Sequence, residues 1–370
     1  MSGLYYKNIS KHLGEDAAFD NFSLAIDAGE FVALVGKNGC GKAELIRLAE
    51  GYGGSHDGDV TIDGRRVTHR TRGHHMASLL NDVPIIGTPR MEMTRILRSL
   101  NVERARIPAR IEEAAKLTGI IDKLDVRYSK LNAEEQLRAG MARAYAARAK
   151  VALMIDPFTE IEPRMAARMR IAVMEFRANT NMIFVMSTNS PASALSMATR
   201  IVVMEQGRIL QSDTAQNIYD FPADRFVAEY FGNALINMIP ATLERAGEEI
   251  HAVFGETRIL IPAGKIGKLV DQSYIGKKVL LGVRPENIHY EQAFISLSPE
   301  SAFEAIVRHI ELMGSETYLH MELDGVEDYL IARVDPRCIA IVGHSLSLAI
   351  DSNRVHIFDI DTEKSILSKL

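Results

Sequence analysis

The sequence predicts an α/β domain built on a parallel sheet, followed by a small all-β domain. Three observations carry this prediction: a glycine-rich loop between an apolar strand and a helix, apolar strands that alternate with helical stretches, and a series of short strands near the C-terminus. Alternating strands and helices favour a parallel sheet covered on both faces, whereas short strands separated by turn residues favour a small barrel.

The glycine-rich loop is Gly36-Lys37-Asn38-Gly39-Cys40-Gly41-Lys42-Ala43. It follows the apolar run Phe31-Val32-Ala33-Leu34-Val35 and precedes a helical pattern from Glu44 to Glu50. This order of strand, loop, lysine and helix is typical of a phosphate-binding P-loop, in which glycine N–H groups and the positive helix end surround the anion. We expect Lys42 to reach the terminal phosphates. Ala43 departs from the pattern, because a Ser or Thr hydroxyl at this position ligates Mg²⁺.

Composition sets the broad class of protein. The 370 residues allow two domains, and 47% hydrophobic with 25% charged residues is enough for packed cores. The net charge of −5 gives no reason to expect nucleic acid as a partner. Two distant cysteines, Cys40 and Cys338, favour a reducing compartment. Met1 to Ser10 has no apolar signal core, and no apolar run approaches the roughly 18 residues of a membrane span. We therefore expect any membrane role to come through a partner.

The remaining elements of the first domain follow from local patterns. Strands are predicted between Leu4 and Ile26, and a hairpin by Asp59 to Ile62 with Arg65 to Val67. Helices are expected at Thr94 to Leu124, Asn132 to Ala149 and Arg164 to Arg177. Buried strands are expected at Val151 to Ile155, Met182 to Met186 and Arg200 to Met204.

The basic segment from Arg65 to His75 carries His69, His74 and His75. A solvated loop is favoured here over a metal site, because no carboxylate or cysteine is spaced to complete a ligand shell.

The pattern changes between Phe221 and Pro240, and we place a domain boundary near residue 236. Short strands separated by Gly, Pro and Asp follow, which favours a small β-barrel. They are His251 to Phe254, Arg258 to Ile261, Lys278 to Val283, Ala305 to Ile310, Thr317 to Leu323, Tyr329 to Val334, Ser345 to Ala349 and Val355 to Phe358.

The order of these pieces resembles the ATPase subunit of an ATP-binding cassette (ABC) importer of the sugar-importer type, with a C-terminal regulatory OB-like (TOBE) domain. The resemblance covers nearly the whole chain. Besides the glycine loop, it rests on Leu131 to Phe158, Ala198 to Met204, Phe226-Val227-Ala228, Gly282-Val283-Arg284-Pro285-Glu286 and Gly314-Ser315-Glu316-Thr317-Tyr318. It implies a RecA-like nucleotide-binding domain at 1–235 with a helical subdomain at about 84–148, and the barrel domain at 236–370.

The resemblance also implies a mechanism and its partners. Two ATPase domains hold each ATP, with Mg²⁺, between the glycine loop of one and the signature helix of the other. Closure of the pair moves two transmembrane permease subunits, which receive the solute from a periplasmic or extracellular binding protein. The chain is then expected at the cytoplasmic face of the inner membrane, held there by the permeases. The resemblance suggests a sugar, a polyol or a related small solute as cargo.

Several motif positions depart from the family pattern, first among the acidic residues. The family has Asp then Glu before the proline that matches Pro157, whereas this chain has Ile155 then Asp156. An isoleucine cannot hold the water shell of Mg²⁺, and Asp156 is one methylene shorter than the carboxylate that polarises the attacking water. A misplacement of about 1 Å can lower the rate on the order of 100-fold. A one-residue slip would instead make Asp156 the metal-side acid and leave the catalytic carboxylate missing.

The signature motif differs as well. Where the family helix begins Leu-Ser-Gly-Gly-Gln, this chain has Leu131-Asn132-Ala133-Glu134-Glu135. Two carboxylates replace groups that face the partner's γ-phosphate, and like charges about 4 Å apart repel by up to about 4 kcal/mol at an effective dielectric constant of 20. Asn132 and Glu135 are spaced as a capping box. We therefore expect the helix to be kept and its phosphate contact to be lost.

Three further positions weaken the predicted site. The switch histidine that contacts the γ-phosphate falls at Asn189, which donates a hydrogen bond but carries no proton. The loop glutamine that senses Mg²⁺ falls at Asn81, and the aromatic residue that stacks on adenine falls at Leu13. Tyr5 and Tyr6 are nearby in sequence but are predicted strand residues.

All these substitutions act on one reaction, which depends on Mg²⁺ and positioned charge. The resulting hypothesis is a weakly active or inactive ATPase subunit that pairs with a different, more complete one in a heterodimer. Two alternatives stay open: an active homodimeric transport ATPase with unusual motifs, and a non-catalytic regulatory subunit in which the β domain binds a ligand or a protein.

Overall fold

The computed structural model describes residues 3–13, 16–52, 54–68, 75–80, 85–232, 235–265 and 274–367, leaving aside the side chains of residues 13 and 16–18. Contacts between Cα atoms divide the chain into two compact units, Met1–Ala215 and Gln216–Leu370. The first unit holds the α/β elements and the second holds most of the remaining strands. The boundary expected near residue 236 from the sequence stays a prediction.

A six-stranded sheet forms the centre of the first unit, in the order β10-β9-β3-β8-β7-β6. All its pairings are parallel except that between β10 and β9. The strands are β3 (Phe31–Val35), β6 (Met76–Ser78), β7 (Val151–Ile155), β8 (Ile183–Thr188), β9 (Arg200–Glu205) and β10 (Arg208–Asp213). The parallel α/β sheet predicted from the alternation of elements is confirmed.

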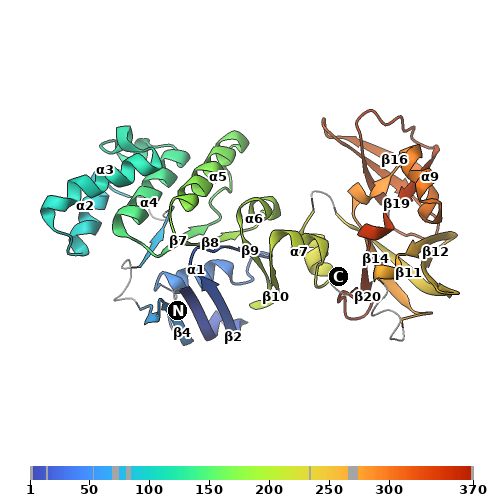
Figure 1. The fold of residues 1–370 in the computed structure, drawn as a ribbon, viewed down its shortest axis with the longest axis horizontal. Helices are drawn as coiled ribbons and strands as arrows, with labels where there is room; N and C mark the ends of the chain where they lie inside the picture. Colours follow the sequence, from blue (N-terminus) through green and yellow to red (C-terminus); the bar gives the residue numbers. More distant parts are fainter. Residues whose placement is uncertain are drawn as a thin grey trace. The chain divides into compact units, whose positions relative to one another are not determined.

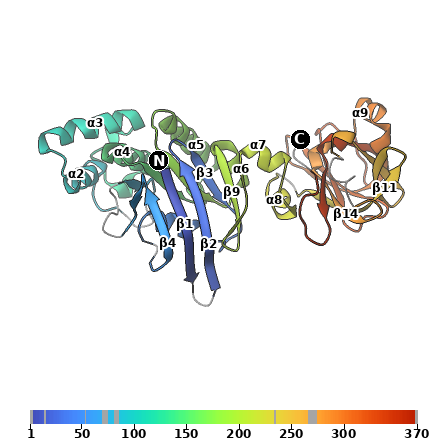
Figure 2. The same ribbon diagram turned by 60° about the horizontal axis from the view of Figure 1, so that its bottom comes forward.

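A second sheet of the first unit is antiparallel, in the order β2-β1-β4-β5. Figure 2 shows its three long strands side by side. Its strands are β1 (Gly3–Leu13), β2 (Asp16–Asp27), β4 (Asp57–Ile62) and β5 (Arg65–Arg66). Helix α1 (Lys42–Ala49) lies between the two sheets (Figure 1). Its Leu45 and Ile46 are fully buried in one core with Tyr6 of β1 and Val32 of β3.

Side chains of the parallel sheet alternate between its faces, as the strand period of two requires. Val32 and Val185 belong to the core around α1, whereas Phe31 and Phe184 stack on each other with ring centroids 5.5 Å apart. Phe184 also meets Phe176 of α5 (Pro163–Ala178) edge to face. Helices α5 and α6 (Pro191–Met197) cover the sheet on this side (Figure 1), so helices lie on both faces.

Three helices form a separate layer beside the sheet: α2 (Pro89–Ser99), α3 (Ile107–Thr118) and α4 (Ala133–Ala147), joined by the 3₁₀ turns η1 (Arg104–Arg106), η2 (Ile121–Lys123) and η3 (Tyr128–Lys130). They share an apolar core. A buried ion pair adds to it, because Arg143 of α4 lies 2.6 Å from Glu92 of α2, and Tyr128 donates to the same carboxylate.

The single helical stretch expected from Thr94 to Leu124 is wrong in two respects. The structure has two helices there, and the first begins earlier, at Pro89. Thr88 caps α2 and accepts a hydrogen bond from the N–H of Met91. Proline near the start of a helix is well tolerated, since its missing N–H would have no partner there, and a second helix starts where Pro108 occupies such a position. The apolar periodicity continues across the break and therefore hides it.

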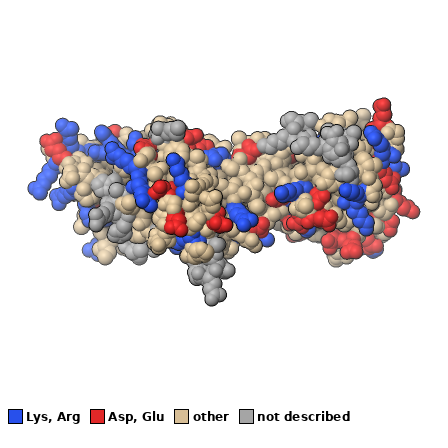
Figure 3. All heavy atoms as spheres, turned by 90° about the horizontal axis from the view of Figure 1, so that it is seen from below, with Lys and Arg blue, Asp and Glu red and all other residues tan. Residues whose placement is uncertain are grey.

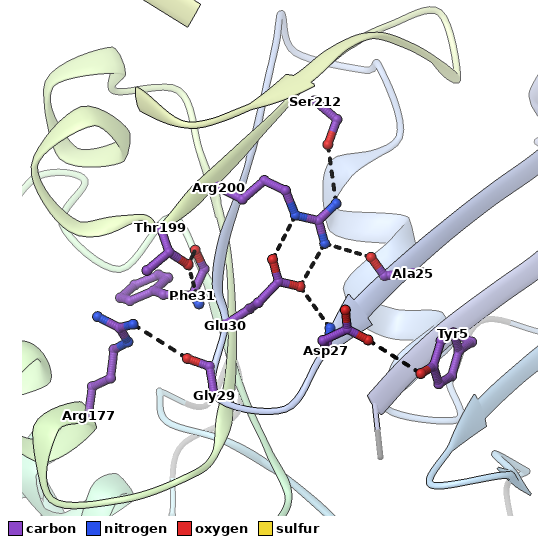
Figure 4. A network of polar contacts seen from close by, with 10 residues as sticks. All are labelled: Tyr5, Ala25, Asp27, Gly29, Glu30, Phe31, Arg177, Thr199, Arg200 and Ser212. Carbon is purple, nitrogen blue, oxygen red and sulfur yellow. Dashed lines mark hydrogen bonds and ion pairs between the residues drawn. The ribbon is translucent and has the colours of Figure 1, made fainter. Parts of the chain in front are cut away.

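Polar contacts fix the entry to β3. Figure 4 shows the guanidinium of Arg200 holding both carboxylate oxygens of Glu30 at 2.9 and 2.8 Å and donating to the carbonyl of Ala25. Thr199 accepts a hydrogen bond from the N–H of Phe31. Burial opposes ionisation of Glu30, but hydrogen bonds from Arg200 and from the N–H of Asp27 outweigh it and lower the pKa of Glu30. The start of the strand that leads to the glycine loop is thus firmly anchored.

The second unit begins at Gln216 in helix α7 (Ala215–Asp220), includes helix α8 (Arg225–Tyr230) and continues as two five-stranded sheets. The first has the order β13-β12-β11-β14-β20 and the second β15-β19-β16-β17-β18. Their buried side chains form one core. The strands are β11 (Asn237–Ala246), β12 (Glu249–Phe254), β13 (Thr257–Ile261), β14 (Lys278–Val283), β15 (Ile288–His289), β16 (Ala302–Leu312), β17 (Thr317–Glu322), β18 (Leu330–Val334), β19 (Ser345–Ile350) and β20 (His356–Asp359).

The predicted β-rich C-terminal region is confirmed, with three additions. Strand β11, at the centre of its sheet, the two-residue strand β15 and helix α9 (Gln292–Leu297) were not predicted. Strand β11 includes Pro240, which lacks an N–H and weakens a strand pattern.

Surface charge is uneven in the first unit, and Lys and Arg gather over the end of the helical layer (Figure 3). The exposed arginines of α2 and of the turn after it include Arg95, Arg98, Arg104 and Arg106. Among the described helices, none is both long and apolar enough to cross a bilayer.

Candidate functional site

The glycine loop lies between β3 and α1, at the carboxyl end of the central strand. Gly36, Gly39 and Gly41 have φ of 151°, 84° and 102°, a range that favours glycine because it has no Cβ. A Cβ on Gly36 would lie 2.1 Å from the carbonyl oxygen of Met204, whereas one on Gly39 would meet nothing within 4 Å. The loop therefore needs glycine at Gly36 for space and at Gly39 for conformation. Its backbone has the turn that the P-loop pattern predicts.

Lys42, the first residue of α1, is held inside this loop. Its ammonium group donates to the carbonyls of Gly36 at 2.7 Å and Lys37 at 3.0 Å, and lies 3.6 Å from the sulfur of Cys40. The side chain is only 6% exposed. The positive charge is thus positioned at the helix start, together with the dipole of α1, where a phosphate group would be attracted.

Asn189 joins the glycine loop to the end of β7. Its side-chain amide donates to Asn38 Oδ1 at 2.8 Å, and its backbone N–H donates to Asp156 Oδ1 at 3.1 Å. Asp156 has φ of 40°, and its own N–H donates to the carbonyl of Ser187. Three positions singled out from the sequence, Asn38, Asp156 and Asn189, are therefore adjacent in space.

Two predicted metal positions carry no ligand atom. Ala43 is half-buried in the first turn of α1, and Ile155 ends β7 with its side chain packed against the core. Neither side chain has an oxygen. Within the described residues, no group of three or more His, Cys, Asp or Glu side chains is placed to hold a metal ion. His69 and His74, the other possible ligands considered, lie outside the described residues, and His75 lies 3.4 Å from Arg65.

The helix expected to carry the signature motif is α4, and its predicted capping box is confirmed. Asn132 Oδ1 accepts from the N–H of Glu135 at 2.9 Å, and Glu135 accepts from the N–H of Asn132 at 3.0 Å. The hydrogen bond from Asn132, followed by that from Lys123, lowers the pKa of Glu135. Ala133 is the first residue of the helix.

Both signature glutamates are paired with cations of the same chain. Glu134 lies 3.1 Å from Arg138 and 2.9 Å from Arg168 of α5, while Glu135 lies 3.1 Å from Lys123. Sequence reasoning missed these cations. The Glu134–Arg138 pair has the i, i+4 spacing of a helical ion pair and was detectable, but Arg168 and Lys123 approach only through the tertiary fold.

Two expected contacts cannot be placed. Asn81, expected to sense Mg²⁺, lies outside the described residues, and so does the side chain of Leu13, expected at the adenine.

The chain is 32% identical over 374 residues to the oligosaccharides import ATP-binding protein MsmX of Bacillus subtilis, covering 99% of this chain and 100% of that protein. It is 27% identical over 377 residues to the trehalose/maltose import ATP-binding protein MalK of Thermococcus litoralis, covering 99% and 100% of the two chains. The model of the ABC transporter family matches residues 19–159, which include the glycine loop and Asp156.

The chain belongs to the ABC transporter ATPase family.

Two further family models match the C-terminal region of this ABC ATPase. The MalK OB fold domain matches residues 236–288, and the TOBE domain matches residues 281–358. A solved structure of cbiO1 from Clostridium perfringens, part of the ABC transporter complex cbiONQ, shares the fold with a TM-score of 0.52 at 16% identity. That likeness covers 58% of this chain and 89% of the other, and it speaks for the fold alone.

Proposed function

We propose that this chain is the nucleotide-binding subunit of a bacterial ABC importer for a sugar, a polyol or a similar small solute. In this proposal it binds ATP through residues Gly36 to Lys42 and hydrolyses it weakly or not at all by itself. The names of the relatives support the cargo class, since one imports oligosaccharides and another trehalose and maltose. Family membership supports ATP as the nucleotide.

The observation that carries the proposal is a contrast within one site. The loop glycines and Lys42 fit a phosphate group. Gly36 lies so close to Met204 that a side chain has no space there, which supports a loop backbone shaped for phosphate binding. The positions expected to hold Mg²⁺ do not fit a metal, because Ala43 and Ile155 end in carbon. Phosphoryl transfer depends on such groups for most of its acceleration.

The remaining reactive positions support the same conclusion. Asp156 supplies a single carboxylate, and its Oδ1 already accepts the N–H of Asn189. Asn189 contacts the glycine loop through Asn38 but has no ionisable group. In this proposal the chain holds a nucleotide through the glycine loop and lacks the groups that would cleave it.

A heterodimer follows from these substitutions within the proposal. Two copies of this chain would form two sites, each with altered residues on both of its faces. A partner with complete motifs would supply its own metal ligands and carboxylate to one site. In the other site, the glycine loop of this chain would hold ATP against the partner's signature helix. Glu134 and Glu135 are paired with cations of this chain, so they would repel the partner's ATP less than two unpaired carboxylates would.

The same proposal covers domain limits, partners and location. Residues 1–235 form the nucleotide-binding domain with a helical subdomain at about 84–148, and residues 236–370 form the regulatory domain. Two permease subunits, fed by a solute-binding protein, would hold the chain at the cytoplasmic face of the membrane.

Calorimetric titration of the purified chain with ATP, with and without Mg²⁺, tests the proposal. We expect binding that Lys42→Ala removes and that Mg²⁺ strengthens by less than about threefold, because two metal positions lack oxygen. Binding that depends strongly on Mg²⁺ would favour the active homodimer. No binding under either condition would favour the regulatory subunit and refute the proposal.

A further inference from the structure

Strand β1 changes the direction of its side chains at Asn8. Leu4 and Tyr6 are buried, but after Asn8 the buried positions become Ile9 and Lys11. Asn8 has φ of 50°, and the pairing of β1 shifts register here against β2, between Tyr6 and Ile9, and against β4, between Lys7 and Ser10. In an unbroken strand, Lys11 would face away from the side where Tyr6 points. The irregularity turns Lys11 inward, as β-bulges next to functional sites often do.

The neighbouring strand is shaped for this irregularity. Gly58 of β4 has φ of 83°, and a Cβ there would lie 2.3 Å from the carbonyl oxygen of Asn8. Only glycine leaves space for the displaced backbone of β1. The inward turn of Lys11 is therefore built into two strands.

Lys11 meets a carboxylate of the helix that follows the glycine loop. Its ammonium group lies 2.5 Å from Glu44 Oε1, and the two side chains are 8% and 10% exposed. Glu44 is the third residue of α1, two positions after Lys42. Its other oxygen lies 3.7 Å from Arg47, whose side chain is 53% exposed. The pair with Lys11 is thus the shorter and the more buried one.

A carboxylate in this position acts on any anion bound by the loop. The first turn of a helix attracts negative charge, so Glu44 is favourable for α1 itself. A phosphate held by the loop is attracted by the same end of the helix, and an ionised Glu44 repels it. Because the Glu44 side chain is only 10% exposed, water and salt screen its charge weakly. A cation against Glu44 removes most of this repulsion.

We propose that Lys11 determines the affinity of the loop for nucleotide phosphates by neutralising Glu44. Lys11 is a positioning residue in this role, because it acts through Glu44 rather than by contact with the nucleotide. The inference rests on the proposed nucleotide binding and adds the pair that regulates its strength. It predicts that the effect of Lys11 depends on the charge of Glu44.

A double-mutant cycle on the full chain tests this dependence, with ATP affinity measured by calorimetry without added metal. Lys11→Met is expected to weaken ATP binding at least about tenfold, since it leaves Glu44 buried without its nearest cation. Glu44→Gln is expected to tighten binding about threefold or more, because Lys11 then adds positive charge beside the phosphates. The double variant is expected to bind within about threefold of the wild type. Arg308→Gln, which breaks an ion pair with Glu322 in the C-terminal unit, is the matched control and should change nothing.

A merely structural pair gives a different result. Glu44→Gln would then fail to tighten ATP binding. An affinity of this variant that is equal to or weaker than that of the wild type overturns the inference. The Glu44→Gln measurement remains a sufficient test if thermal unfolding shows that Lys11→Met does not fold. A folded Lys11→Met protein with wild-type affinity overturns the inference and leaves the proposed function standing. A wild-type chain that binds no ATP refutes both.

Discussion

Asn189 donates its side-chain amide to the side-chain oxygen of Asn38 at 2.8 Å, across a separation of 151 residues. One residue follows β8 and the other lies in the glycine loop, so the contact joins the two segments that frame the candidate nucleotide site. Neither side chain titrates, and the contact therefore adds no charge at any pH between 5 and 8.

Replacing Asn189 by His introduces a titrating group at this contact. A histidine with an ordinary pKa of about 6.5 is charged at pH 5.5 and neutral at pH 7.5, so the variant should bind ATP more tightly at the lower pH. Titration with ATP at both values measures the effect. The wild type gives the change due to ATP alone, and equal changes in both proteins would contradict the assigned position of Asn189.

The glycine loop offers a matched pair of substitutions. Gly36→Ala should abolish ATP binding and lower the thermal unfolding midpoint, since its Cβ would lie 2.1 Å from a carbonyl oxygen of β9. Gly39→Ala meets nothing within 4 Å and carries only the strain of its φ of 84°, roughly 1 to 2 kcal/mol. We expect it to lose about that much stability, which is less than Gly36→Ala should lose. Equal losses in the two variants would show that space at Gly36 is not limiting.

The capping box of α4 gives a prediction about stability. Asn132→Ala removes the side-chain oxygen that accepts the N–H of Glu135 and should lower the free energy of unfolding by about 1 kcal/mol. Urea denaturation measures this loss. Asn132→Ser keeps a capping oxygen and should lose less than half as much, and the cap is unimportant if Ser and Ala behave alike.

These local features were predictable because their causes lie within a few residues. The glycine loop occupies eight consecutive positions, and the cap of α4 needs only Asn132 and Glu135, three residues apart. Local patterns also located most strands of the parallel sheet, since buried strands are short apolar runs.

The features that escaped prediction depend on distant residues or on breaks in a pattern. Arg168 neutralises Glu134 from another helix. The residues near Glu134 in the sequence do not predict this contact. The inward turn of Lys11 requires a bulge in β1 and a glycine in β4, 47 residues further on. The apolar period that joins α2 and α3 likewise gave no sign of the turn between them.

Acid sensitivity of the C-terminal unit follows from His356. Burial, together with the positive charges of Arg284 and Lys265, lowers the pKa of His356 to about 3. An unfolded histidine has a pKa of about 6.5, so the unfolded state binds an extra proton between these values. The stability contributed by neutral His356 is present above pH 6.5 and is lost as the pH falls toward 3, by up to about 1.4 kcal/mol per pH unit.

His356→Gln removes this proton uptake. The variant should therefore lose less stability than the wild type between pH 6.5 and pH 4.5, as measured by the urea midpoint at the two values. Identical losses in the two proteins would mean that His356 titrates normally in the folded state.

The central claim is that this chain binds ATP without the groups that cleave it, and the steady-state rate of ATP hydrolysis by the purified chain tests it most directly. We expect the wild type to be no faster than Lys42→Ala, and a chain carrying Ala43→Ser, Ile155→Asp, Asp156→Glu and Asn189→His to exceed both by about tenfold or more. A wild-type rate far above that of Lys42→Ala would contradict the claim.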